Sequence, residues 1–551
     1  MHKAVNRLSP GLSHLGMLIP ISLLLALVLL FPGLQPSLRG AETNEQQLMQ
    51  LLQSNASPME KDSACAQLKR IGTDESVPAL AALLTDEQLS QSARYALEAM
   101  SSPEAGRSLI AALDNTTGLT KAGIIESLGI RSETKAMPAL AKALADSDPA
   151  VACAAATALG QIANPEAVAA LQAALNGSAG PVHNAVVDAT LRCANHLLAV
   201  GEQPKASALF QQLYDTQKED FARVAAFRGV ILAGVKQSLA LATQAILGKA
   251  GPGQTAALQL VHDLDALGAT EAFAQLLPQV GAPVQVALVE GLSQRNDPKA
   301  APAIAALMSS AVPEVRLAAI NALAIIGDNT AVLLLAESTA SATGAEQSAA
   351  REALVQLRRG QSAEMMLDQL PTAKPAVQAE LARALGARGE SAAIPKLLEL
   401  ARQGSDSARK AALLALAQLV DQGQLASLVQ LVVEAKNDTA RAQAAEALNS
   451  ACQHVQSRRG RVDVEPLVSG LATGSAEARM ALLPVCAGFN DLQVRTALRA
   501  AIGDTNLQVR AAAIRALCDT MDAELLPDLP SWLAGCRRRI SEAWRLAVAC
   551  I

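Results

Sequence analysis

Apolar residues recur through most of the chain at the three- and four-residue spacing of an α-helix. The stretch PEVRLAAINALAIIGD, from Pro313 to Asp328, is mostly Ala, Leu and Ile, and similar text recurs around a fixed leucine that we call the anchor, here Leu323. A period near 31 residues predicts a repeat array of about fifteen units. Strong copies have their anchors at Leu68, Leu97, Leu128, Leu159, Leu323, Leu354, Leu385, Leu416, Leu448 and Leu517, and weaker copies at Leu191, Val230, Leu260, Leu292 and Leu483.

Each unit carries the signals of two short helices. Glycine stands shortly after many anchors, where a left-handed residue would stop the first helix. Proline opens the second helix, as in Met137-Pro138, because it is tolerated in a first turn. Turns such as Asp146 to Pro149 supply N-cap oxygens. Such pairs must stack to cover their apolar faces, so we expect an all-α solenoid with one long concave surface. The predicted stops are Gly72, Gly129, Gly160, Gly327 and Gly386.

The repeat text resembles a known family. The pattern D-P-x-V-R-x-x-A-x-x-A-L-G-x-I-G is nearly complete from Pro313 to Asp328 and from Asn506 to Cys518. It resembles HEAT repeats, particularly the short bacterial type related to phycobilisome-lyase repeats. The resemblance extends over about residues 58–530 and implies an α-solenoid. It implies no single activity, because that family includes scaffolds, adaptors, lyases and subunits of complexes.

The N-terminus has the features of an export segment. Lys3 and Arg7 precede an apolar run without charges, which is densest over residues 15–31. This arrangement is typical of a signal peptide, and the length of the run also allows an uncleaved membrane anchor. Either alternative puts the body of the chain outside the cytoplasm, in the periplasm or the extracellular space. The predicted domains are the signal peptide or anchor 1–41, a linker 42–57, the solenoid 58–530 and an atypical tail 531–551.

Composition narrows the classes of partner. Hydrophobic residues make up 51% of the chain but aromatic residues only 2%, which favours closely packed small aliphatic layers. The net charge of −5 would repel a phosphate backbone, so nucleic acid is not expected as a partner. The cysteines within the repeats are predicted to be buried free thiols. They are Cys65, Cys153, Cys193, Cys452, Cys486 and Cys518.

Two regions depart from the repeat. A longer unit near residues 192–230 gathers aromatic and basic side chains that could form a partner-contact patch, or could simply fill a longer hairpin. The residues of this patch are Phe210, Tyr214, Phe221, Arg223, Phe227 and Arg228. The tail contains Trp532 and Trp544, and either an atypical cap or an end altered by a change of reading frame would have this composition.

No motif for catalysis or cofactor binding emerges. His-Glu pairs of the kind that hold iron in HEAT-like hydroxylases are missing from the sequence, and residues 247–254 lack the spacing of a phosphate-binding loop. Cys193 with His196 and Cys452 with His454 have no partner pair at zinc spacing, and His262-Asp263 is equally isolated. We therefore assign no catalytic, cofactor-binding or metal-binding residue.

Arg316, in the first turn of its helix, has counterparts in Arg223 and Arg510. We expect it to bridge to a carboxylate or to carbonyl groups of a neighbouring turn. Taken together, the sequence predicts a non-catalytic scaffold or adaptor that binds proteins outside the cytoplasm, with residues 15–31 as a membrane tether if they are not removed. The alternative is a lyase-like or accessory subunit of a cell-envelope enzyme. No small-molecule substrate and no cofactor are predicted.

Overall fold

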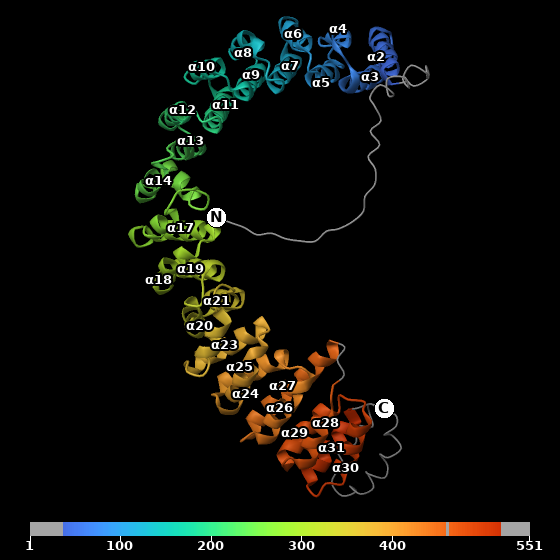
Figure 1. Ribbon diagram of the computed structural model, residues 1–551, viewed down its shortest axis with the longest axis vertical. Coiled ribbons are helices and arrows are strands. Elements are labelled where there is room, and N and C mark those ends of the chain that lie inside the picture. Colours follow the sequence, from blue (N-terminus) through green and yellow to red (C-terminus); the bar gives the residue numbers. More distant parts are fainter. Residues whose placement is uncertain (1–36, 459–461, 520–551) are drawn as a thin grey trace, which may run out of the picture. The chain divides into compact units, whose positions relative to one another are not determined.

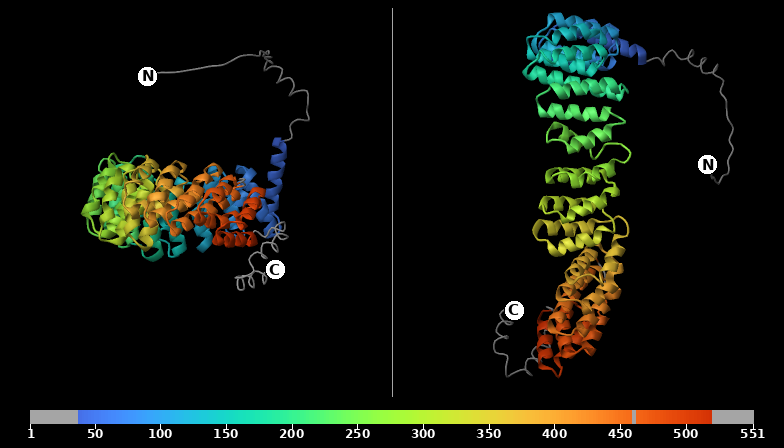
Figure 2. Two further views of the ribbon diagram at one scale, coloured as in Figure 1. Left: turned by 90° about the horizontal axis from the view of Figure 1, so that it is seen from below. Right: turned by 90° about the vertical axis from the view of Figure 1, so that its left-hand side faces the viewer.

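The computed structural model describes residues 37–458 and 462–519, with side chains from residue 44 onward. Every regular element in this part of the chain is a helix, and the chain divides into two compact units at Val235 and Lys236 (Figure 1). Within each unit, antiparallel helix pairs follow one another, as the right-hand view of Figure 2 shows. Each unit is therefore an α-solenoid, as predicted.

The first unit has two layers of helices. The helices that carry the anchors pack on one another in chain order and form what we call the anchor layer; the helices between them form the second layer. The anchor layer consists of α3 (Pro58–Ile71), α5 (Ser90–Ala99), α7 (Gly118–Ile130), α9 (Pro149–Ile162), α11 (Gly180–Ala199) and α13 (Asp220–Ala233). The second layer consists of α4 (Val77–Ala81), α6 (Pro103–Ala112), α8 (Met137–Ala143), α10 (Pro165–Ala174) and α12 (Gln203–Thr216).

The second unit repeats this arrangement. Its anchor layer consists of α15 (Pro252–Gln259), which ends one residue before its anchor, α17 (Ala282–Arg295), α19 (Pro313–Ile326), α21 (Gly344–Gln356), α23 (Pro375–Arg388), α25 (Asp406–Leu419), α27 (Asp438–Ser457), α29 (Ala476–Cys486) and α31 (Leu507–Asp519). Its second layer consists of α14 (Ser238–Leu247), α16 (Ala269–Ala274), α18 (Ala301–Ala306), α20 (Ala331–Ser341), α22 (Ser362–Gln369), α24 (Ile394–Gln403), α26 (Leu425–Glu434), α28 (Glu465–Thr473) and α30 (Leu492–Ile502). Short 3-10 turns precede several of these helices.

The anchors form the centre of each stack. Leu128, Leu159, Leu323 and Leu385 are completely buried, in keeping with an anchor that faces both neighbouring helices. The predicted helix starts are confirmed, because prolines such as Pro138 lie in the first turn of their helices. The N-cap prediction is confirmed as well: the Asp148 side chain accepts a hydrogen bond from the backbone N–H of Ala150 at the start of α9.

The helices do end within about two residues of the predicted glycines, but none of these five glycines takes the left-handed conformation. Gly129, Gly160 and Gly386 lie inside α7, α9 and α23, and Gly72 and Gly327 end their helices in an extended conformation. The first three are needed for close packing instead. A Cβ at Gly129 would lie 2.7 Å from Cα of Ala158 in the next anchor helix, and Gly386 meets Ala415 in the same way.

Two anchors also need correction. Gly160 packs against Ala189 just as Gly129 packs against Ala158, so the anchor of α11 is the buried Thr190 and not Leu191. In α29 the anchor is the buried Cys486 and not Leu483. Pro484, two positions before Cys486, is exposed, like the residues two positions before the anchors Leu385 and Leu416. Neither residue is a leucine, so a search for the recurring leucine of the repeat did not find them. The long unit interval is then the 40 residues from Thr190 to Val230, and a second, of 38 residues, separates Leu448 from Cys486.

The predicted linker at 42–57 is wrong, because α2 (Ser37–Gln53) packs on α3 and extends the stack. Leu48 and Leu52 are buried in this contact. The buried carboxylate of Glu45 accepts hydrogen bonds from the backbone N–H of Thr73 (2.5 Å) and from its hydroxyl (3.0 Å). Residues 15–31 and the tail 531–551 lie outside the described residues, and none of the described helices is long and apolar enough to cross a membrane.

Arginines tie successive anchor helices together. Arg295 donates hydrogen bonds to the carbonyls of Val261 (3.2 Å) and Leu264 (2.9 Å) in the preceding unit, where the end of a helix leaves carbonyls without partners. The residue after it, Asn296, is left-handed (φ 58°) and ends α17. The same combination recurs at Arg131 with Ser132 and at Arg388 with Gly389. Left-handed residues therefore follow the ends of α7, α17 and α23, whereas the extended Gly72 and Gly327 end α3 and α19.

Four of the six cysteines within the repeats are buried free thiols, as predicted. Burial raises the pKa to about 11 for Cys65, Cys193 and Cys452 and to about 12 for Cys486. Cys153 is only partly buried, and Cys518 is exposed. These side chains thus serve mainly as small apolar groups.

Candidate protein-binding surface

The anchor layer exposes one residue two positions before most of its anchors, on a backbone that the repeat keeps nearly constant. In the first unit these residues include Tyr95, Glu126 and Asp188, and in the second Glu290, Asn321, Glu352, Arg383, Leu414 and Glu446. Unlike the anchors, they differ in size, polarity and charge. The anchor layer therefore presents a regular framework with a non-repeating set of side chains, and selectivity for a partner would be found among these.

Apolar side chains interrupt this surface in the second unit. Ile325 in α19 and Leu414 in α25 are about half exposed (52% and 51%), and α21 and α23 lie between them in the stack. An exposed apolar side chain on its own is ordinary. Two on the same layer, with a charged cluster on the helices between them, make this face the strongest candidate for contact with a partner.

Arg316 has the structural role that we expected. Its Nε and one Nη donate to the carboxylate of Glu346 in α21 at 3.0 and 2.8 Å, and its other Nη donates to the carbonyl of Ser310 at 2.8 Å. These hydrogen bonds raise the pKa of Arg316 and lower that of Glu346. One positive and one negative charge are matched here, so the pair joins α19 to α21 without leaving a net charge.

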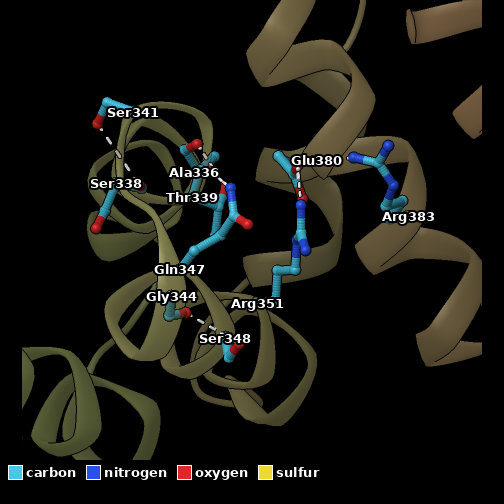
Figure 3. Close-up of polar contacts among 10 residues, drawn as sticks. All are labelled: Ala336, Ser338, Thr339, Ser341, Gly344, Gln347, Ser348, Arg351, Glu380 and Arg383. Carbon is cyan, nitrogen blue, oxygen red and sulfur yellow. Dashed lines mark hydrogen bonds and ion pairs between the residues drawn. The ribbon is translucent and has the colours of Figure 1, made fainter.

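A different cluster joins α21 to α23. Glu380 is buried, with its side chain only 6% exposed. Arg351 donates hydrogen bonds from Nε and Nη2 to the two carboxylate oxygens of Glu380, both at 2.8 Å (Figure 3). Arg383 donates from Nη1 to the same carboxylate at 2.7 Å. Hydrogen bonding to Glu380 raises the pKa of Arg351. Both arginine side chains nevertheless remain exposed, at 44% for Arg351 and 40% for Arg383.

The residues of this cluster differ in type from those at the equivalent positions of other repeats. Arg351 stands three positions before its anchor, where other units have apolar residues such as Ile125, Ile320 and Leu413. Glu380 stands five positions before its anchor, where small residues such as Ala318, Ala349 and Ala411 are usual. Sequence reasoning missed both residues, although an arginine at an apolar repeat position was a signal that could have found one of them.

Arg94 in the first unit occupies the same repeat position as Arg351. The facing position in α7 is Gly123, and the Arg94 guanidinium fills the space over it: a Cβ on Gly123 would lie 2.7 Å from Nε. Arg94 donates to the hydroxyl of Ser127 (3.2 Å), which in turn donates to the carboxylate of Glu98 (2.8 Å). It also lies 4.6 Å from the ring centre of Tyr95. This arginine packs into the layer and differs in that respect from Arg351.

The predicted aromatic patch is divided by the structure. Phe210 in α12 is 1% exposed and packs against Gly229, so its inclusion in a contact surface is corrected: it fills the longer hairpin. Tyr214 and Phe227 are in contact, with ring centres 4.7 Å apart and ring planes tilted by 42°, and Arg223 lies 5.0 Å from the centre of the Tyr214 ring. Phe221 is 67% exposed at the start of α13.

The two arginines of the predicted patch, Arg223 and Arg228, lie partly buried on α13. Arg223 also donates from Nε to the carbonyl of Tyr214 at 3.3 Å, which ties the two helices together. Arg228 is partly buried at the surface position of α13, two residues before its anchor. The contact patch stays a prediction for the members that reach the surface.

The polar positions considered for chemistry are dispersed. His262 lies 3.8 Å from Asp263 and borders an open pocket with Asp265, Arg295 and Asp297. Cys193 is buried in α11, and its thiol faces the carbonyl of Leu159 at 4.0 Å. Across residues 44–458 and 462–519, no three His, Cys, Asp or Glu side chains are placed to hold a metal ion.

Comparison with known proteins agrees with the architecture. The family model of HEAT repeats matches residues 107–192, 270–355 and 363–449. These three segments of the solenoid therefore consist of HEAT repeats. The search of curated proteins gives no match.

Solved structures with similar helical arrays include karyopherins. Kap121p bound to RanGTP is 14% identical with a TM-score of 0.43, over 90% of this chain and 66% of that one. Kap121p bound to Ste12p is 13% identical with a TM-score of 0.43, over 87% and 65%. Importin beta is 12% identical with a TM-score of 0.36, over 89% and 84%. This chain thus spans about two thirds of the two Kap121p chains.

Proposed function

We propose that the chain is a non-catalytic scaffold that binds a protein partner through the anchor layer of its HEAT repeats and acts outside the cytoplasm. The observation that carries the proposal is the surface formed by α19, α21, α23 and α25. Exposed Ile325 and Leu414 lie there on either side of the exposed Arg351 and Arg383. Arginine is enriched in protein-binding hot spots, and the buried core of an interface is more apolar than the rest of the protein surface.

The repeat architecture itself supports a scaffold. Stacked helix pairs need only their shared apolar faces for stability, which leaves the surface positions free to vary from unit to unit. Here the buried positions are mostly Ala and Leu. The exposed positions of four successive anchor-layer helices are instead occupied by different residues, namely Asn321, Glu352, Arg383 and Leu414. Such a surface suits an extended partner that contacts several units at once.

The location outside the cytoplasm is proposed from the N-terminal sequence. Lys3 and Arg7 followed by the apolar run 15–31 have the order of an export signal. A reporter enzyme that is active only after export, fused behind residue 57, tests this directly. We expect activity with the natural N-terminus and loss of activity when residues 15–31 are deleted; equal activity of both fusions would contradict export.

Binding is tested with paired substitutions on the two layers. Leu414→Glu places a charge on the anchor layer, and Leu333→Glu makes the same change at an exposed leucine of α20 in the second layer. After affinity capture from cell-envelope extract, we expect a partner whose recovery falls at least about tenfold with Leu414→Glu and stays unchanged with Leu333→Glu. Recovery of the same proteins by both variants and by the wild type would show that the anchor layer is not the binding surface.

A further inference from the structure

We infer that Arg351 and Arg383, held in place by Glu380, form a receptor for a carboxylate group of the partner protein. The inference rests on the proposed scaffold function and adds the chemistry of recognition. It assigns Glu380 as a positioning residue and the two exposed guanidinium groups as the contact. The partner is expected to present an acidic side chain to α21 and α23.

Burying a carboxylate is costly, so Glu380 requires compensation. A charged group in the interior is tolerated only when it is paired and hydrogen-bonded. Three charge-assisted hydrogen bonds from Arg351 and Arg383 supply this pairing, and both carboxylate oxygens accept at least one of them. The result is two guanidinium groups fixed side by side at the surface, with less side-chain freedom than free arginines would have.

The cluster keeps capacity for another anion. An arginine has five N–H donors. Arg351 uses two of its donors and Arg383 one on Glu380. Two positive charges face one negative charge, so a net positive charge remains at the exposed end. A second carboxylate from outside would therefore find charge, free donors and planar guanidinium groups suited to paired hydrogen bonds.

Comparison with the neighbouring helices shows that stacking alone does not require this arrangement. Arg316 and Glu346 join α19 to α21 with one charge of each sign. In the interface of α23 with α25 the positions equivalent to Arg351 and Glu380 are the buried Ala382 and Ala411, so no charge stands there. A one-to-one pair or an apolar contact thus suffices to stack this fold, and the second arginine on Glu380 is surplus to that task.

The neighbouring surface adds an apolar element. Leu414 on α25 occupies the repeat position that Arg383 occupies on α23, and it is half exposed. Packed helices lie roughly 8–10 Å apart. A partner segment that places an acidic side chain on Arg383 can therefore place an apolar side chain on Leu414 at about that distance. The fitting occupant is an acidic segment of a protein that also carries exposed apolar residues.

The test uses the full chain and a fluorescein-labelled peptide of alternating Glu and Leu, with a Gln and Leu peptide as its uncharged counterpart. Arg383→Gln removes one exposed guanidinium and leaves the Arg351–Glu380 pair intact. We expect it to weaken binding of the Glu peptide about tenfold, the effect of losing a charged hydrogen bond. Arg402→Gln is the matched control, because Arg402 is 38% exposed and paired with Glu434 in the second layer.

Glu380→Gln separates positioning from simple charge attraction. The substitution makes the site more positive, so non-specific attraction predicts tighter binding of the Glu peptide. If Glu380 positions the arginines, binding weakens despite the added positive charge. Circular dichroism melts identify the temperature range in which each variant is folded, and binding is compared within that range.

Several results would overturn the inference. They are no binding of the Glu peptide by the wild type, equal binding of the Glu and Gln peptides, and no loss with Arg383→Gln. These results can be distinguished from results that would contradict the proposed scaffold function. If the captured partner is lost with Leu414→Glu but kept with Arg383→Gln, the scaffold stands and the carboxylate receptor falls; if it is kept with both, the anchor layer is not the docking surface at all.

Discussion

Gly129 offers a sharp test of how the repeats pack. In Gly129→Ala the new Cβ would lie 2.7 Å from Cα and 2.8 Å from Cβ of Ala158, against ordinary contacts of 3.4–4 Å. Backbone atoms cannot turn aside as a flexible side chain can, so α7 and α9 must move apart. Overpacking of this kind costs about 1–3 kcal/mol, and the better helix propensity of alanine returns about 1 kcal/mol. We therefore expect a net loss of up to about 2 kcal/mol.

The assay is urea unfolding followed by circular dichroism, with native-state hydrogen exchange to locate the loss at α7 and α9. Gly177→Ala is the control in the same unit, because a Cβ there meets nothing within 4 Å, and its effect should stay within about 0.5 kcal/mol. A Gly129→Ala protein as stable as the wild type, with unchanged exchange in both helices, would refute the close-packing explanation.

Other predictions follow from burial and charge. Phe210→Ala should cost about 3–5 kcal/mol of unfolding free energy, whereas Phe221→Ala should change it by less than about 0.5 kcal/mol, as measured by urea unfolding. Arg316 lowers the pKa of Glu346. The pair therefore stabilises the fold fully above the ordinary glutamate pKa, and this stabilisation is lost as the pH falls through the lowered pKa. The difference in unfolding free energy between wild type and Arg316→Gln should accordingly shrink from pH 7 towards pH 3. The buried thiol of Cys486, with its pKa raised to about 12, should resist iodoacetamide at pH 8 until denaturant is added, and mass spectrometry would show early modification if this burial were wrong.

The candidate surface was only partly predictable. The sequence showed the aromatic cluster, and the structure places Phe210 in the core while Phe221 reaches solvent. An arginine at the apolar repeat position marked Arg351 in the sequence. Its partner Glu380 could not be found in that way, because the residue that faces Arg351 depends on how α21 and α23 are offset when they stack. A repeat pattern gives the spacing of equivalent positions but not the contacts between different positions in successive units.

Hydrophobic periodicity by itself determined the all-α repeat architecture, the number of units and the starts of the helices. These follow from local rules: apolar spacing, proline in first turns and polar N-caps act within one helix and its own turn. Tertiary structure decided that Thr190 and Cys486 are anchors, that Gly129 and Gly386 allow neighbouring helices to approach closely, and that Glu380 holds two arginines. The close approaches of Gly129 and Gly386 and the pairing of Arg351 with Glu380 join atoms 29 residues apart, and these distances are set by how the helices pack and not by the sequence of any one repeat.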